Sequence, residues 1–174
     1  MKTIMNKSGF TWFILLALAF TGCQGDQEGK HHFDNKVFIS AASYTPEVRV
    51  MRDALDVTKE QTCEITVAMA QPVAKDIAVS FAEAPELLDR YRTFYDDPTA
   101  RLLPSDGGYY DFSQISAVIK TGLVQSEPLA FTFKNLDKLP IENKERYVLP
   151  MTIVSADGMD VLESARTAYF VFMK

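Results

Sequence analysis

Between residues 36 and 174 the chain alternates between apolar and polar positions, which is the pattern of half-buried β-strands. The clearest stretch runs from Cys63 to Met69, where every second residue is apolar. The predicted strands cover residues 37–39, 47–51, 63–70, 75–82, 115–121, 129–133, 146–154, 159–162 and 167–173. Short strands separated by turn residues favour an antiparallel β-sandwich, so we predict an all-β fold.

One segment, residues 85–95, has helical spacing instead. Its apolar positions recur every three or four residues, at Leu87, Leu88, Tyr91, Phe94 and Tyr95. A proline at residue 85 suits a first helical turn, and the acidic pair at 96–97 followed by a proline ends the pattern. We predict a short amphipathic helix that bridges the two sheets, with its aromatic stripe in the core.

Two residues within the strands carry specific expectations. Cys63 lies in phase with the apolar positions of its strand, which predicts a buried and unreactive thiol rather than a nucleophile. Pro150 cannot donate a hydrogen bond to a neighbouring strand, which predicts a sheet edge or a bulge within residues 146–154.

The first 35 residues predict the cellular location of the protein. Lys2 and Lys7 precede an apolar run at 10–20, and this order is typical of a secretory signal peptide at 1–22. The small residues before Cys23 resemble a bacterial lipobox, which implies cleavage before Cys23 and its lipidation; the alternative is ordinary cleavage beside a free cysteine. Residues 23–35 are polar and predict a flexible tether, and their acidic start is similar to the surface signal of Bacteroidota lipoproteins. We therefore predict a lipid anchor in the outer membrane that holds the domain at the cell exterior.

The charge, cysteine and histidine content of the chain limit which ligands and partners can be expected. Residues 23–174 contain 16 basic and 23 acidic residues, so removing Lys2 and Lys7 changes the net charge from −5 to −7. An acidic domain lacks the clustered Lys and Arg that nucleic acid requires, so we expect no nucleic-acid partner. If Cys23 is lipidated, Cys63 is the remaining thiol and no intramolecular disulfide forms. The only histidines, His31 and His32, lie in the tether, and we predict no metal and no cofactor.

The centre and the C-terminal half of the chain contain several short motifs, and their order along the chain is informative. The motifs are LLDRY at 87–91, LLP at 102–104 with YY at 109–110, VIKTG at 118–122 and RYVLPMTI at 146–153. In this order they resemble domain-of-unknown-function family 1735, over residues 36–174. Arg92 departs from the family pattern, in which Asn usually follows the tyrosine.

The resemblance implies an immunoglobulin-like β-sandwich in surface lipoproteins of Bacteroidota that are often encoded with glycan-utilisation systems. Such proteins usually carry a lectin-like or glycosidase domain after this one, and we expect no such domain within residues 36–174. The family has no assigned catalytic residues, so none is carried over.

The sequence shows no recognisable catalytic motif. A glycosidase needs two carboxylates about 5–10 Å apart across a sugar, and the acids at 96, 97, 106 and 111 are better explained as turn and helix-end residues. The serines lack a nucleophile elbow, and no phosphate-binding loop is present. We predict a protein that is not an enzyme.

The loop at 101–112 is the predicted binding site. Tyr109 and Tyr110 could stack on a sugar, and Asp106 and Asp111 could bind its hydroxyls; the alternative is that the rings pack inside and pin the loop. Alternation predicts that one ring points in and the other out. The leading hypothesis is a non-enzymatic accessory glycan-binding module that serves surface glycan-uptake proteins. The alternative is a structural or protein-interaction module that assembles with another surface protein.

Overall fold

The computed structural model describes residues 33–42, 50–112, 115–140 and 145–173, which belong to one compact unit spanning His31–Lys174. The predicted signal peptide, Cys23, His31 and His32 lie outside the described residues, as does most of the strand predicted at 47–51. Among the residues that the structure does describe, no helix is long and apolar enough to cross a membrane.

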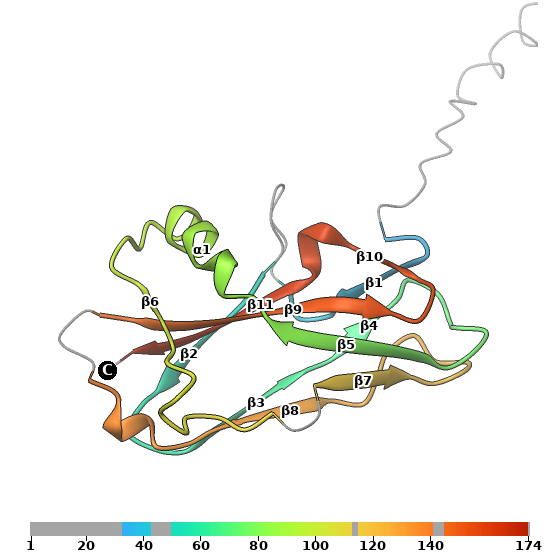
Figure 1. Ribbon diagram of the computed structural model, residues 1–174. Helices are drawn as coiled ribbons and strands as arrows, with labels where there is room; N and C mark the ends of the chain where they lie inside the picture. The colour runs from blue at the N-terminus through green and yellow to red at the C-terminus, as the bar shows by residue number, and fades with distance from the viewer. Residues whose placement is uncertain (1–32, 43–49, 113–114, 141–144, 174) are drawn as a thin grey trace, which may run out of the picture. The chain divides into compact units, whose positions relative to one another are not determined.

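The domain is an immunoglobulin-like β-sandwich with a six-stranded sheet as its larger layer (Figure 1). That sheet runs in the order β2-β11-β9-β5-β7, with β6 paired to β9 beside this path. Its members are β2 (Val50–Asp56), β5 (Ile77–Glu83), β6 (Arg101–Leu102), β7 (Ser116–Ile119), β9 (Tyr147–Ala156) and β11 (Thr167–Met173). The all-β prediction is confirmed.

The facing layer consists of shorter strands. β3 (Gln61–Ile65) pairs with β8 (Leu129–Phe133), and β1 (Lys36–Ile39) lies between β4 (Val67–Ala68) and β10 (Asp160–Val161). Most pairs are antiparallel, as predicted, but β1–β10, β2–β11 and β6–β9 are parallel. Three short 3₁₀ turns complete the described elements, η1 (Pro85–Leu87), η2 (Leu136–Lys138) and η3 (Glu163–Ala165).

The core between the layers is built from aromatic rings on β8 and β11. Phe133 lies with its ring centroid 5.1 Å from Phe170 and 5.0 Å from Phe172, and the centroids of Phe131 and Phe170 are 5.2 Å apart. All four side chains are at most 1% exposed. Because edge-to-face and tilted rings fill space without voids, these contacts hold the two layers in register.

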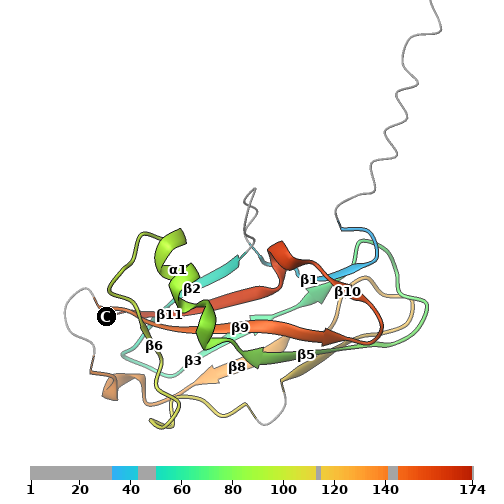
Figure 2. The ribbon, with the colours of Figure 1, turned by 45° about the horizontal axis from the view of Figure 1, so that its top comes forward.

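The helix α1 (Leu88–Phe94) covers the outer face of the six-stranded sheet (Figure 2). Tyr91 is fully buried there, with its ring centroid 5.2 Å from that of Tyr169 on β11. The prediction that this helix bridges two sheets is wrong, because the strands on either side of it, β5 and β6, belong to the same sheet. The aromatic stripe faces inward at Tyr91, as predicted, whereas Phe94 is 38% exposed.

The helix explains why β9 and β11 are apolar on both faces. In β9, Tyr147, Leu149, Met151 and Ile153 face the core between the layers, and Val148 faces the helix. A strand that is covered on both faces has a nearly continuous apolar sequence rather than an alternating one.

Pro150 lies in the middle of the sheet, not at its edge. β9 is flanked by β11 and β5, and the carbonyl oxygen of Pro150 accepts a hydrogen bond from the Ala84 amide at 2.9 Å. The missing N–H of Pro150 therefore faces the place where β5 ends and the chain turns into η1, so no strand needs it. A bulge does occur in β9, but at Val154, because Ser80 is paired with Ser155 and Phe81 with Ile153.

Arg92, on the helix, holds the segment between the helix and β6 by hydrogen bonds. Its guanidinium donates two hydrogen bonds to the carbonyl oxygen of Ala100, from Nε at 2.9 Å and from Nη2 at 2.6 Å. On the same loop, the buried carboxylate of Asp97 forms an ion pair with Arg146 at 3.0 Å. The residue that departs from the family pattern thus has a structural role in this chain.

Candidate binding face

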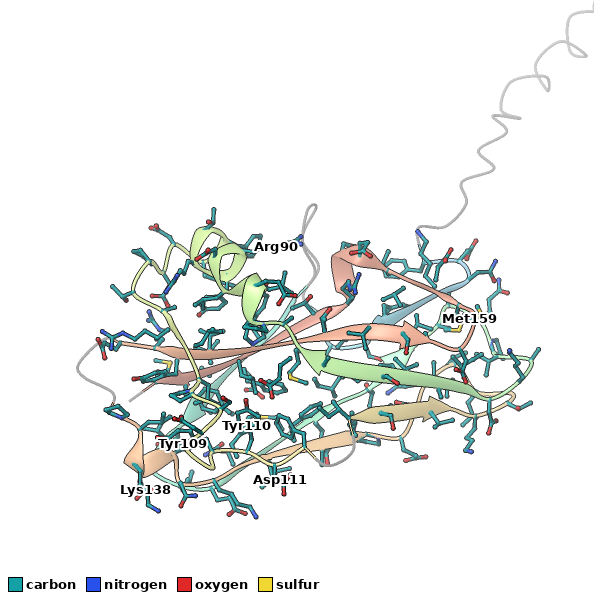
Figure 3. All side chains as sticks on the ribbon, viewed as in Figure 1. Arg90, Tyr109, Tyr110, Asp111, Lys138 and Met159 are labelled. Carbon is teal, nitrogen blue, oxygen red and sulfur yellow. The ribbon has the colours of Figure 1, made fainter. Side chains whose placement is uncertain are left out.

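The loop predicted to bind ligand has its aromatic rings inside. Tyr109 is 8% exposed and belongs to the main core, and Tyr110 is half-buried and stacks on Phe112 with ring centroids 4.7 Å apart. The expectation that one ring points outward is wrong, because both rings fill space beneath the loop (Figure 3). Burial, and then the carboxylate of Glu83, raises the pKa of the Tyr110 phenol.

The acidic residues of the same loop remain at the surface. Asp106 and Asp111 are exposed, and Figure 3 shows Asp111 at the outer rim of the domain. A ligand role for Asp106, Tyr109, Tyr110 and Asp111 stays a prediction, and it would have to depend on the two carboxylates rather than on stacking rings. Within the described parts of the chain, no group of three or more His, Cys, Asp or Glu side chains could hold a metal ion.

Cys63 is a core residue, as predicted. Its side chain is 5% exposed, and its Sγ donates a hydrogen bond to Oδ2 of Asp53 at 3.0 Å. Burial, and then this carboxylate, raises the pKa of the thiol to about 12. A thiol that stays protonated at neutral pH is a poor nucleophile.

A hollow of about 460 Å³ lies beside β1, in a part of the chain that the sequence analysis assigned no ligand role. The rings of Phe33 and Phe38 are half-buried in its wall, with centroids 5.0 Å apart and planes at 63°. Asp34, Ser40 and Gln71 add a carboxylate, a hydroxyl and an amide to the same wall. We call this the aromatic pocket.

The backbone around the aromatic pocket is well fixed. The amide of Ser40 donates to the carbonyl oxygen of Thr66 at 2.9 Å, and the amide of Leu162 donates to that of Val37 at 2.9 Å. Ile39 and Ala165, each 1% exposed, complete the apolar lining. Phe38 and Ile39 of the lining belong to β1, whereas Phe33, Asp34, Ser40 and Gln71 lie in turns beside β1 and after β4.

Two more hollows lie on either side of Arg166. One, of about 740 Å³, is lined among others by Lys36, Asp160 and Glu163, and the other, of about 200 Å³, by Glu86, Arg90 and Thr152. Arg166 and Glu163 line both, and we call the pair of hollows the polar groove. In Figure 3, Arg90 lies on the helix and Met159 in the turn between β9 and β10.

Arg166 is held rigidly in the polar groove. Its guanidinium donates to Oε1 of Glu163 at 2.6 Å, to Oγ1 of Thr152 at 3.1 Å and to the carbonyl oxygen of Ile153 at 2.9 Å. Because these bonds use Nε and both terminal nitrogens, the planar group has a defined orientation. The sequence gives little sign of this groove, since its residues come from β1, η1, α1, β9, β10 and η3.

A family model for an N-terminal domain matches residues 33–160, which is most of the chain. The chain belongs to the DUF1735 family of N-terminal domains. The resemblance predicted from the sequence motifs is thereby confirmed. A search of curated proteins finds no match.

Solved structures confirm the family's fold. A DUF1735-containing multidomain protein from Bacteroides ovatus is similar at 19% identity and a TM-score of 0.52, over 79% of this chain and 44% of that one. A Bacteroides ovatus protein proposed to bind carbohydrate has 20% identity and a TM-score of 0.63, over 80% of this chain and 37% of that one.

Bacteroides thetaiotaomicron EndoBT-3987, solved with a Man5GlcNAc product, has 10% identity and a TM-score of 0.56, over 71% of this chain and 28% of that one. The chain thus spans less than half the length of each of these three proteins.

Proposed function

We propose that this DUF1735 domain is a non-enzymatic, accessory glycan-binding module of a cell-surface polysaccharide-utilisation system. The observation that carries the proposal is the aromatic pocket, in which two phenyl rings stand beside a carboxylate, a hydroxyl and an amide. Sugars have apolar C–H faces that pack on aromatic rings, and hydroxyls that need both donors and acceptors. A pocket with both kinds of group suits such a ligand.

Similar proteins support this direction. Among proteins with this fold are one proposed to bind carbohydrate and one solved with a Man5GlcNAc product. In both, the part similar to this chain is less than half of the protein. The buried Cys63 thiol stays protonated, and the buried Asp97 carboxylate is held in an ion pair with Arg146. Because neither side chain is placed to act in catalysis, both observations fit a binding role.

The surface location is a separate part of the proposal. We infer that Cys23 carries lipid and anchors the domain in the outer membrane, facing the exterior, where it would meet glycan before uptake. Protease treatment of intact Bacteroidota cells expressing the chain should degrade it. A Cys23→Ser variant should leave the membrane fraction, and retention of that variant in the membrane would contradict lipid anchoring.

The binding experiment uses the full-length chain with Cys23→Ser, secreted and purified without detergent. We would screen it by glycan array and calorimetry against Man5GlcNAc and against the neutral polysaccharides mannan, amylopectin, xylan and galactan. We expect saturable binding to one of these, reduced at least about tenfold by Phe38→Ala, which corresponds to about 1.4 kcal/mol of binding free energy. The control is Phe94→Ala, which removes an exposed ring on the helix, outside the aromatic pocket. Absence of binding to every glycan would contradict the proposal.

The predicted loop site is tested in the same screen by a double variant, Asp106→Asn with Asp111→Asn. Both side chains are exposed, so the fold should persist. Loss of binding in this variant but not in Phe38→Ala would place the site at the loop and not at the aromatic pocket.

A second candidate function is assembly with another surface protein. β7 is a terminal strand of the six-stranded sheet, and apolar side chains are exposed on it and on the following turn, with Val118 at 37%, Leu123 at 49% and Val124 at 44%. An open edge with apolar side chains is a site where a partner can dock. If Val118→Lys abolished co-purification with one surface protein while glycan binding was absent, this alternative would be favoured.

A further inference from the structure

The aromatic pocket and the polar groove adjoin each other along β1 and η3. Lys36 lines the groove and Phe38 lines the pocket, and side chains two residues apart on a strand lie on the same face, about 6.6 Å apart along it. On η3, Ala165 lines the pocket, whereas Glu163 and the following Arg166 line the groove. The two hollows are therefore lined by neighbouring residues on two separate elements.

Together the hollows extend further than one sugar unit needs. The aromatic pocket alone, at about 460 Å³, is within the range of about 300–1,000 Å³ that encloses a drug-sized molecule. The groove adds hollows of about 740 and 200 Å³ beyond it. Its far end is formed by Glu86 and Arg90, near the start of the helical segment.

The charges of the groove are balanced. Lys36, Arg90 and Arg166 carry positive charge, and Glu86, Asp160 and Glu163 carry negative charge. Within the described residues, neither Lys36 nor Arg90 takes part in an ion pair, so both retain donors for a ligand. Interspersed donors and acceptors with no net charge fit hydroxyl groups better than they fit a run of carboxylates or sulfates.

We propose that the ligand is an extended, neutral oligosaccharide that lies across η3, with one end in the aromatic pocket and the chain continuing past Arg166 toward Arg90. This inference rests on the proposed function, because it specifies the ligand class of the same site. At the middle of this path, the guanidinium of Arg166 donates hydrogen bonds to the ligand from a fixed position, because its hydrogen bonds within the protein hold it in place. Arg90 and Asp160, which are both exposed, bind the later units.

The test is the dependence of affinity on chain length, measured by calorimetry on the full-length Cys23→Ser chain. The probes are α-mannose oligomers of one, two, four and six units, and the corresponding oligomers of any other neutral polysaccharide that binds in the screen. We expect the hexamer to bind at least about tenfold more tightly than the dimer, because added units contact the groove. A hexamer that binds no more tightly than the dimer would overturn the inference while leaving the proposed function intact.

Variants separate the two ends of the path. Arg90→Ala and Asp160→Asn should each weaken the hexamer about threefold to tenfold and leave the dimer unchanged, while Phe38→Ala should weaken both. Lys138→Ala, which removes an exposed lysine far from the groove in Figure 3, should change neither. Equal losses for dimer and hexamer in the groove variants would contradict an extended site.

Salt dependence tests the neutral character of the ligand. Affinity for a neutral oligomer should change less than about twofold between about 0.05 and 0.5 M salt, because screening acts on charge–charge attraction. Tighter binding of a polyanionic glycan such as polygalacturonate, lost at high salt, would overturn the neutral assignment. Absence of binding to any oligomer would reject the proposed function itself.

Discussion

Gly107 gives the sharpest prediction about the fold, because any side chain there meets a buried ring. A Cβ at this position would lie 1.8 Å from Cε2 and 2.4 Å from Cζ of Tyr109, whereas real Cβ contacts essentially never fall below 3.0 Å. The ring cannot move outward freely, since Tyr109 is 8% exposed and packed in the core. In Gly107→Ala, either the loop backbone or the ring must shift.

We expect Gly107→Ala to lower the free energy of unfolding by about 1–3 kcal/mol, the usual cost of forcing an extra group into a packed core. The control is Gly122→Ala, where no atom lies within 4 Å of the added Cβ. Gly122 has a φ of +81°, so alanine there should cost about 1 kcal/mol through backbone strain alone.

Urea unfolding followed by circular dichroism measures both variants, and a double-mutant cycle with Tyr109→Ala identifies the cause. Without the ring, Gly107→Ala should cost no more than about 0.5 kcal/mol, so the two changes should be strongly non-additive. If Gly107→Ala costs the same with and without the Tyr109 ring, the steric explanation is refuted.

Three further predictions concern packing and pH. Phe133→Ala should lower the free energy of unfolding by about 3–5 kcal/mol in urea denaturation, because the ring is fully buried between the layers. Tyr91→Ala should weaken the packing of the helix on the sheet, so hydrogen exchange relative to the unmutated protein should accelerate more for the α1 amides than for the β9 amides. Equal acceleration in both elements would contradict local undocking of the helix. Hydrogen bonds, first from Lys120 and then from Thr121, lower the pKa of Asp76 to about 2, so its contribution to stability is complete above about pH 4 and is lost as pH falls toward 2. Asp76→Asn should remove that part of the acid sensitivity, and a carboxyl-carbon NMR titration of Asp76 with a midpoint near 4 would contradict it.

Much of the fold could be predicted from local sequence. Alternation located most of the strands, and helical spacing located residues 85–95, because each of these patterns depends only on which side chains face the core. The buried state of Cys63 followed from the same alternation. The two-residue strand β6 was missed, because its residues are both exposed and it carries no apolar period.

The candidate site was less predictable. Aromatic residues in a glycine-containing loop suggested an exposed platform, but Tyr109 and Tyr110 fill the core beneath it. Phe33 was assigned to the tether and Phe38 to an ordinary strand, yet their rings form the wall of the aromatic pocket. Composition alone cannot separate a ring that packs from a ring that lines a hollow.

By itself the sequence determined most of the strand positions, the helix at 85–95, the family and the acidic balance, because these depend on the local order of residues and on composition. Only the tertiary structure decided that Pro150 lies in a central strand, where the end of β5 removes the need for its missing donor. It also decided that Arg166, Lys36 and Arg90, which are up to 130 residues apart in the chain, border two hollows that share Arg166 and Glu163 in their walls. The physical reason is that strand pairing and layer packing bring distant residues together, and a binding surface is formed by that proximity.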